Sequence, residues 1–145
     1  MDTVSAEKRS RNMSRIKGRD TKPEKTVRSL LHAMGCRFRL HVKDLPGKPD
    51  IVLPRRKCVI FVHGCFWHGH QGCRRASIPA TRTEFWTAKI HGNRQRDEQT
   101  VAALEKLGWR CLVVWQCRLH DKAALRRLLA AFLNIEDSPA SPPPD

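Results

Sequence analysis

The chain has 145 residues, enough for a single domain with one modest core. Its 28 Lys and Arg residues against 14 Asp and Glu give a formal net charge of +14. This favours a polyanionic partner, with nucleic acid first and an anionic membrane surface or a solvated, tail-like charge excess as alternatives. No apolar stretch approaches the roughly 20 residues that span a bilayer, and the first residues lack the apolar core of an export signal, so a soluble, unexported protein is expected.

Residues 1–19 are predicted to form a basic N-terminal arm. Within residues 5–19 the sizeable apolar side chains are Met13 and Ile16, which lie three positions apart and would share one face of a helix. The arm cannot bury a face of its own, so a short helix and a solvated, disordered segment remain alternatives. The rest of the chain is predicted to be one domain, 20–135, followed by a Pro- and Ser-rich tail, 136–145, that is expected to be disordered.

The domain is predicted to open with a core-packed helix. Thr21-Lys-Pro-Glu24 has the spacing of a capping box with Pro in the first turn. Apolar residues then recur at the spacing of one helix face, and Gly35 follows them. These residues are Val27, Leu30, Leu31 and Met34.

Three strands are predicted next, over 36–42, 50–53 and 57–62. The last is a run of β-branched and aromatic residues, and Pro54-Arg-Arg makes a tight connection before it. The last two strands should therefore form an antiparallel hairpin. Residues 63–80 are rich in Gly, His and Cys and show no period, which indicates a structured loop.

A second helical region is predicted from residue 81 onward. Thr81-Arg-Thr-Glu84 can cap it, and Gly92 is expected to interrupt it before a helix over 97–107. A buried strand over 109–115 and an amphipathic helix over 121–133 complete the order α, β, β, β, α, β, α. The apolar face of the last helix is predicted to contain Leu125, Leu128, Leu129, Phe132 and Leu133.

Three of the six cysteines sit singly in apolar surroundings and are expected to be small buried hydrophobes: Cys36, Cys58 and Cys111. The others lie near histidines, which without an export signal favours metal over disulfides. Four potential ligands lie in and after the loop: Cys65, His70, Cys73 and Cys117. Three thiolates and one imidazole form a closed structural Zn²⁺ site. Thiols that merely pack together remain an alternative, and His63 and His68 compete as the imidazole ligand.

A catalytic site is predicted where the hairpin brings Asp50 near Val62. Adjacent strands lie about 4.8 Å apart, so the Asp50 carboxylate and the backbone near Val62 can hold one hard cation. Mg²⁺ takes oxygen ligands, often with substrate phosphate among them, and can polarise a phosphodiester. His63 and His68 can exchange a proton near neutral pH.

Restriction-type nucleases also supply a second acid and a Lys from the second strand, and this strand has neither. A backbone carbonyl and a His must then substitute. Glu24 is a candidate for a further carboxylate, although its place in the capping box explains it equally well.

Phe66 and Trp67 are large adjacent aromatics in the loop. Stacking in the core is the ordinary explanation for such residues. Insertion between base pairs, which kinks a duplex, is the other. Trp86 on the next helix, and Met13 and Ile16 in the arm, could enter the duplex with them.

The sequence closely resembles the very short patch repair (Vsr) endonucleases, from about residue 8 to 120. The central run Val59-Ile-Phe-Val-His-Gly-Cys-Phe-Trp-His68 is highly specific. Further matching segments are Asn12-Met13, Pro46-Gly-Lys-Pro-Asp50, Pro79-Ala-Thr-Arg-Thr-Glu-Phe-Trp86, Lys89-Ile90, Asn93, Arg96-Asp97 and Leu107-Gly-Trp-Arg110.

The resemblance implies a restriction-endonuclease-like fold of the PD-(D/E)xK type, with a mixed β-sheet flanked by helices. It implies magnesium-dependent hydrolysis that nicks duplex DNA on the 5′ side of the T in T:G mismatches, which arise when 5-methylcytosine deaminates. The implied context is a monomer in the bacterial cytoplasm, associated with the nucleoid, working with a cytosine-5 DNA methyltransferase and a repair polymerase.

The resemblance also implies roles for individual residues. Asp50 and the Val62 carbonyl would bind Mg²⁺, His68 would activate water, and His63 and Glu24 would support the site. The structural Zn²⁺ ligands would be Cys65, His70, Cys73 and Cys117. The DNA contacts would come from Phe66, Trp67, Trp86, Lys89 and Asn93, and from Met13 and Ile16 in the minor groove.

Two departures from the family pattern matter for the site. Val62 stands where a Thr can occur, which has little effect if only its backbone oxygen is used. One residue within Gln71-Gly72 is inserted before Cys73, which could shift the choice of imidazole ligand.

Two other functions remain open on the sequence. One is a non-catalytic, zinc-stabilised DNA-binding module, and the other is a nuclease that ignores sequence and mismatch. Asp50 separates the module from an enzyme, because only an enzyme needs its carboxylate.

Overall fold

The structure is a computed structural model that describes residues 21–135. The predicted arm, with Met13 and Ile16, and the predicted tail lie outside the described residues. The described chain forms α2 (Lys22–Ala33), β1 (Ile51–Leu53), β2 (Cys58–His63), α3 (Thr83–Lys106), β3 (Arg110–Trp115) and α4 (Lys122–Leu133). Among these residues, no helix has the length and apolar character to cross a bilayer.

The three strands form one mixed sheet in the order β1-β2-β3. β1 and β2 pair antiparallel with Ile51 opposite Ile60, so the predicted hairpin is confirmed, and a 3₁₀ turn, Pro54–Arg56, joins its strands. β2 and β3 run parallel, with His63 opposite Trp115 at the end of the pair. A parallel pair needs a long crossover, and the connection through α3 provides it.

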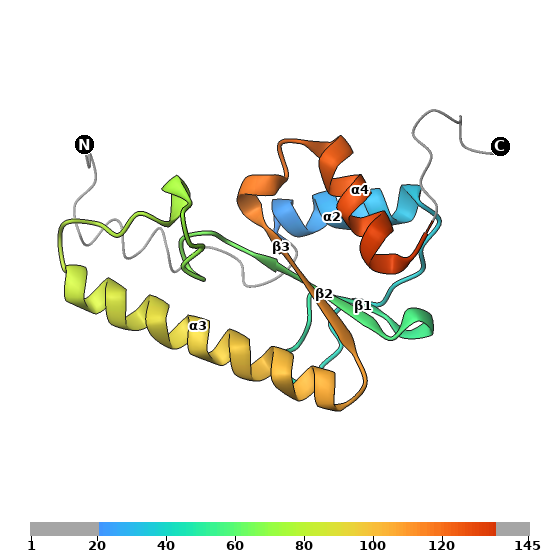
Figure 1. Cartoon of the computed structure of the whole chain (residues 1–145), viewed down its shortest axis with the longest axis horizontal. Helices are drawn as coiled ribbons and strands as arrows, with labels where there is room; N and C mark the ends of the chain where they lie inside the picture. Colours follow the sequence, from blue (N-terminus) through green and yellow to red (C-terminus); the bar gives the residue numbers. More distant parts are fainter. Residues whose placement is uncertain (1–20, 136–145) are drawn as a thin grey trace.

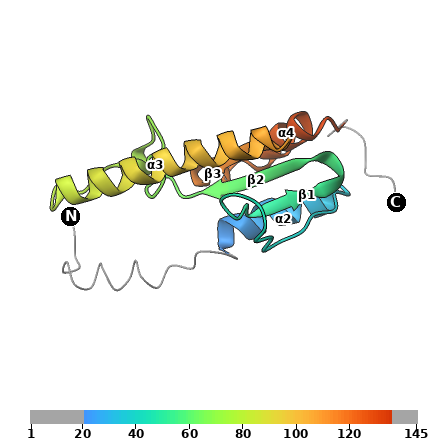
Figure 2. The ribbon, with the colours of Figure 1, turned by 90° about the horizontal axis from the view of Figure 1, so that it is seen from below.

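Two apolar clusters cover the two faces of the sheet, because successive strand residues point to opposite faces. Ile60 belongs to the cluster beneath α2 and α4, whereas Phe61 belongs to the cluster beneath α3. Figure 1 shows α2 and α4 on one side of the strands and α3 on the other, and Figure 2 shows α3 and α2 on opposite sides from below. The predicted mixed sheet flanked by helices is confirmed.

The first helix follows its prediction closely. The Oγ1 atom of Thr21 accepts a hydrogen bond from the backbone N–H of Glu24 at 3.4 Å, so Thr21 caps α2 as its spacing predicts. Val27 and Leu31 are fully buried one turn apart. Local capping and periodicity are therefore sufficient to define α2.

The last helix matches its prediction except at one residue. α4 buries a row of leucines four residues apart, Leu125, Leu129 and Leu133. Leu128, predicted on this face, is 41% exposed. With 3.6 residues per turn, its direction differs by about 100° from that of Leu129, which turns it toward solvent. β3 is also less buried than predicted, since only its Val114 is fully buried.

The strand predicted over 36–42 is wrong. Within the described chain this segment pairs at one residue, Arg39, which forms an isolated antiparallel bridge to Val52. β1 has only three residues to offer a partner, and His41 adopts a left-handed φ of 58° that turns the chain out of strand geometry. Phe38 and Leu40 pack against the core without belonging to a strand.

The break predicted at Gly92 is also wrong, because α3 runs without interruption for 24 residues. A helical glycine costs about 1 kcal/mol relative to alanine, and each half of α3 has a buried anchor, Ile90 and Leu104. The helix also begins later than its predicted cap at Thr81: its N-cap residue is Arg82, which is left-handed and forms no side-chain capping bond.

Gly47 marks a close approach between the loop before β1 and α3. Its φ is +72°, and a methyl group there would overlap the methyl of Thr100. Gly47→Ala is expected to lower the free energy of unfolding by about 1–3 kcal/mol more than Gly35→Ala, because overpacking adds to backbone strain. Gly35 has a similar φ, +78°, in open space. Denaturant titration measures both variants, and equal losses would contradict a packing role for Gly47.

Candidate active site and metal centre

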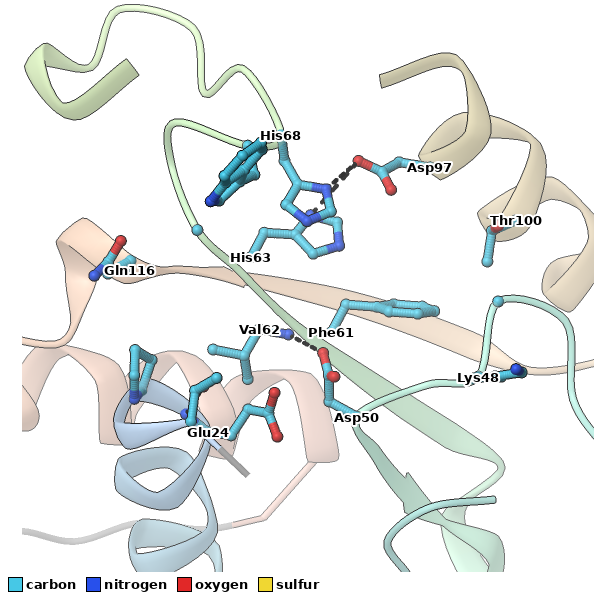
Figure 3. Close-up of a pocket in the computed structure, with 15 residues that line it drawn as sticks. Glu24, Lys48, Asp50, Phe61, Val62, His63, His68, Asp97, Thr100 and Gln116 are labelled. Atoms are coloured by element: carbon cyan, nitrogen blue, oxygen red, sulfur yellow. Dashed lines mark hydrogen bonds and ion pairs between the residues drawn. The ribbon is translucent and has the colours of Figure 1, made fainter. Parts of the chain in front are cut away.

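Asp50 lies immediately before β1, beside the end of β2 (Figure 3). Its Oδ2 atom accepts a hydrogen bond from the backbone N–H of Val62 at 2.7 Å. The N–H and C=O of one strand residue point toward the same neighbour, so the Val62 carbonyl faces the Asp50 side of β2. A carboxylate and a backbone carbonyl are both oxygen ligands of the kind that Mg²⁺ takes.

Glu24 brings a second carboxylate to Asp50 from the first turn of α2. It is 3% exposed, and Arg28 donates a hydrogen bond to its Oε2 at 3.1 Å. Burial raises the pKa of Asp50 to about 7; the N–H of Val62 opposes this rise, while the charge of Glu24 and a hydrogen bond with it add to it. The two carboxyls therefore favour holding a proton between them. A hard cation fits here because it would replace that proton.

A second polar group lies across the cleft from Asp50: His63, His68 and Asp97 (Figure 3). The Nδ1 atom of His68 is 2.6 Å from Oδ2 of Asp97. An ionised carboxylate only accepts hydrogen bonds, so Nδ1 of His68 carries the hydrogen and its Nε2 keeps a free lone pair. His68 can therefore accept a proton while Asp97 orients its ring.

His63 stacks against His68, with ring centroids 3.7 Å apart and planes within 4°. Burial lowers the pKa of His63 to about 4; the charge of His68 lowers it further, and Asp97 opposes the shift. Its buried Nδ1 has no hydrogen-bond partner among the described residues. His63 is thus held neutral and adds no like charge beside the His68 ring.

Sequence reasoning missed Asp97 as a site residue. It lies seven residues after Ile90 and seven before Leu104, the two buried residues of α3, so it occupies the buried row of a continuous helix. An acidic residue in such a row is a usable signal. The predicted break at Gly92 concealed it, because it divided the row between two helices.

Both groups line one cleft of about 660 Å³. Asp50 and Glu24 form one wall, and His68 and Asp97 form the other (Figure 3). Trp67 also lines the cleft. Asp50 and Glu24 can hold a hard cation on one wall, and His68 can accept a proton on the other. A ligand bound in the cleft would lie between the two walls.

The cysteines and histidine proposed from the sequence as zinc ligands converge on one point. Their ligand atoms all lie within 4.8 Å of one another, and they come from Cys65, His70, Cys73 and Cys117. The Sγ atom of Cys117 is 3.5 Å from Nδ1 of His70. Tetrahedral Zn²⁺, with Zn–S bonds of about 2.3 Å and Zn–N bonds of about 2.0 Å, spaces its ligand atoms by roughly 3.5–3.8 Å. The donor set therefore fits Zn²⁺.

The thiols of this cluster differ in acidity. Burial raises the pKa of Cys65 to about 11, although the backbone N–H of Cys117 opposes the rise. Burial also disfavours the thiolate of Cys73, but hydrogen bonds from the N–H of Arg75, from neighbouring thiols and from the N–H of Ala76 lower its pKa overall. A bound dication would stabilise the thiolate form at both positions.

The residue inserted within Gln71-Gly72 is absorbed in a turn. Gly72 has a left-handed φ of +73° with open space around it, and the N–H of Cys73 donates to the carbonyl of His70 at 3.3 Å. His70 joins the cysteines, whereas the competing candidates, His63 and His68, lie in the other group.

Phe66, Trp67 and Trp86 form one half-buried aromatic group beside the cleft, with ring centroids 5.3–5.9 Å apart. They belong to neither apolar cluster of the sheet, so core stacking does not account for them. The Lys89 ammonium lies 5.9 Å from the Trp67 ring, and Asn93 donates to the Trp67 carbonyl at 2.8 Å. These five residues form one surface of aromatic and polar groups.

Comparisons with known proteins point to one family. The family model described as DNA mismatch endonuclease Vsr matches residues 1–75. The chain is 54% identical over 133 residues to the type II nicking enzyme V.XorIIP of Xanthomonas oryzae pv. oryzae. The matched region covers 92% of this chain and 97% of that relative. It is 50% identical over 117 residues to the DNA mismatch endonuclease Vsr of Escherichia coli, covering 81% and 74% of the two chains. The type II nicking enzyme V.NmeAIP of Neisseria meningitidis is 45% identical over 138 residues, with 94% and 98% coverage. The chain belongs to the Vsr family of DNA mismatch endonucleases.

Proposed function

We propose that this protein is a magnesium-dependent endonuclease that nicks duplex DNA 5′ to the T of a T:G mismatch. The observation that carries the proposal is the cleft itself, in which Asp50, bonded to the backbone of Val62, lies across from the His68–Asp97 pair. Membership of the family supports it, as do relatives named as a mismatch endonuclease and as nicking enzymes. The restriction-endonuclease-like arrangement of the sheet is part of the same proposal.

Asp50 and the carbonyl of Val62 would hold Mg²⁺, with Glu24 supporting the carboxylate from α2. When bound, the metal would polarise the scissile phosphodiester and offset charge that develops on its oxygens. Glu24 and Arg28 pair, so the support carries little net charge of its own. Of the two proposed Mg²⁺ ligands, Asp50 and the Val62 carbonyl, Asp50 therefore supplies the negative charge.

His68 would take the proton of the attacking water at its Nε2 atom. Asp97 fixes the tautomer and the ring orientation through its 2.6 Å contact with Nδ1, and then stabilises the imidazolium that forms. Neutral His63 stacks on the ring without adding a like charge. General base catalysis of this kind contributes about 10²–10⁴-fold.

The aromatic group would enter the base stack at the mismatch. Half-buried rings beside a cleft can unstack and kink a duplex, and a T:G pair is weaker than a matched pair and therefore easier to open. Phe66, Trp67 and Trp86 would do this, and Lys89 and Asn93 would contact the opened pair. Met13 and Ile16 of the arm are proposed to enter the minor groove from the other side.

Zn²⁺ held by the four-residue cluster would be structural. The ligand set is closed, without an open position for substrate. The origin of the substrate, by deamination of 5-methylcytosine, links the proposed activity to a cytosine-5 DNA methyltransferase before it and to a repair polymerase after it.

A nicking panel tests the proposal. Labelled duplexes with T:G, T:A or C:G at one position in the same flanks are incubated with the protein and Mg²⁺. The expected result is one nick, on the T strand of the T:G duplex, 5′ to the T. Equal cutting of all three would indicate a nonspecific nuclease. Tight binding to T:G without any cutting would indicate a DNA-binding module instead.

Asp97→Asn is expected to slow nicking by about 10²–10⁴-fold under single-turnover conditions, because the amide can stabilise the wrong tautomer of His68 and cannot balance the imidazolium. Binding of the T:G duplex should change little. The matched control is Glu98→Gln, which removes the adjacent, exposed acid of α3. Similar losses in the two variants would contradict the assigned role of Asp97.

A further inference from the structure

We propose that Lys48 is a further catalytic residue, which contacts the scissile phosphate and supplies the positive charge that β2 lacks. This inference rests on the proposed function. β2 reads Cys-Val-Ile-Phe-Val-His and contains neither Lys nor Arg. A nuclease site in this sheet therefore needs a cation from elsewhere in the chain.

The charges that line the cleft identify the candidate. Its lining includes three carboxylates, from Glu24, Asp50 and Asp97. Lys48 is the single Lys or Arg among the described residues that line it. Arg28 balances Glu24, but without a bound metal Asp50 and Asp97 would still repel a phosphate, even in a chain with a net charge of +14. Lys48 is the residue placed to reverse that repulsion close to Mg²⁺.

The position of Lys48 suits this role. Two residues of chain span at most about 7 Å, so Lys48 is tied closely to Asp50. Lys48 and Gln116 lie at opposite ends of the cleft (Figure 3). Lys48 is exposed, and within the described part of the chain no ion pair or hydrogen bond holds its ammonium. The side chain is therefore available to a phosphate.

The backbone at Lys48 is strained. Its φ is +47°, a left-handed conformation that glycine or asparagine adopts at lower cost than lysine. Buried Pro49 follows it, and a residue before proline favours extended backbone. Gly47, packed on Thr100 of α3, holds the same turn. A lysine in such a position suggests that its side chain is needed there, since strained residues cluster at functional sites.

A neighbouring cavity of about 460 Å³ also contains Lys48 in its lining, with more basic residues than the cleft has. Its charged and titratable lining residues are the basic Arg28, Lys43 and Lys48, the acidic Glu24 and Asp50, and His41. Lys48 thus stands between the cleft and a more basic surface, along which the next phosphates of the same strand could run. Lys106, an exposed lysine in the last turn of α3, lines neither cavity, which makes it a matched control.

The test measures single-turnover nicking of a T:G duplex with enzyme in saturating excess. It compares the wild type with Lys48→Gln, Lys48→Gly, Lys48→Arg and the control Lys106→Gln. Loss of one preorganised donor at the reacting group slows chemistry by about 10²–10³-fold, and this is expected for the Gln and Gly variants. Lys48→Gly relieves the backbone strain, so a loss of rate there cannot come from added strain in this turn. Lys48→Arg should recover most of the rate.

Lys106→Gln is expected to leave the saturated rate close to that of wild type, because Lys106 lines neither cavity. A saturated rate for Lys48→Gln or Lys48→Gly near that of wild type would overturn the proposal, whether or not binding weakens. Failure of the wild type to nick would instead reject the proposed function, so the two failures are distinguishable.

Discussion

Replacing Asp50 with asparagine is expected to lower magnesium-dependent nicking of a T:G duplex by about 10³-fold or more. Asparagine keeps the shape and an oxygen that can accept the 2.7 Å hydrogen bond from Val62, but it loses the charge needed to hold Mg²⁺. A metal ion at a phosphoryl group contributes several kcal/mol, and each 1.36 kcal/mol is a factor of ten in rate. Single-turnover nicking measures the loss.

The same variant should still bind the T:G duplex, because the aromatic group and the basic surface are untouched. Nicking at the wild-type rate by Asp50→Asn would contradict the assignment of the site. Loss of both binding and nicking would show that Asp50 maintains the fold rather than the metal. Asp44→Asn is a suitable control, since it removes an exposed acid from the loop before β1.

Asp50→Asn is also expected to stabilise the metal-free protein at pH 8. Burial, opposed by the N–H of Val62 and reinforced by Glu24, raises the pKa of Asp50 from 3.8 to about 7 in the folded state. The protonated form is therefore the one that folding favours, and its contribution to stability is lost as the pH rises toward and through 7. Asparagine has no such loss, and the gain at pH 8 has an upper bound of about 4 kcal/mol.

Denaturant titration of metal-free protein at pH 4, 6 and 8 measures this effect. The advantage of Asp50→Asn should be small at pH 4 and should grow up to pH 8. Added Mg²⁺ should stabilise the wild type at pH 8 but not the variant. A variant that is less stable than wild type at pH 8 would contradict the raised pKa of Asp50.

The parts of the fold that sequence predicts well are those with local signals. Thr21 and the Val27–Leu31 spacing define α2 through contacts within one or two turns. Pro54 and the apolar run after it define the hairpin in the same way. The cysteine and histidine cluster is different, because it is predicted from the ligand types of its residues and not from local structure. The structure brings Cys65 and Cys117 together although they are 52 positions apart in the chain.

The parts that sequence predicts poorly depend on distant partners. Gly92 looks like a break locally, but Ile90 lies against Gly69 of the loop and Leu104 packs on the sheet, and together they keep α3 continuous. The 36–42 segment has strand propensity but meets a β1 of only three residues. Asp97 becomes a site residue only when α3 lies beside the loop that carries His68. Tertiary context decides each of these cases.

Loss of metal binding at the cluster of Cys65, His70, Cys73 and Cys117 is expected to lower the stability of the protein by a large amount. Between residues 64 and 82, Cys65 is the one fully buried residue, so this loop has almost no core to hold it. Structural zinc contributes an apparent 10–16 kcal/mol in small peptides, and part of this, several kcal/mol, should appear here. The expected fall in Tm for Cys117→Ser is roughly 10 °C or more.

Cys111→Ser is the matched control, because Cys111 lies in β3 but outside the cluster. It should keep one equivalent of zinc by metal analysis, whereas Cys117→Ser should lose it. Wild-type protein stripped of zinc and returned to buffer with Mg²⁺ should behave like Cys117→Ser. Full nicking by the stripped protein would contradict a supporting role for the cluster.

Zinc removal should affect the two walls of the cleft differently. Asp50 and Val62 are held by the β1–β2 pair, so the zinc-free protein should still be stabilised by Mg²⁺. His68 lies in the loop, three residues after Cys65 and two before His70, and depends on the cluster to reach Asp97. The expected result is a protein that binds Mg²⁺ but does not nick. If nicking and Mg²⁺ binding are instead lost together, the cluster supports the whole sheet rather than the loop that carries His68.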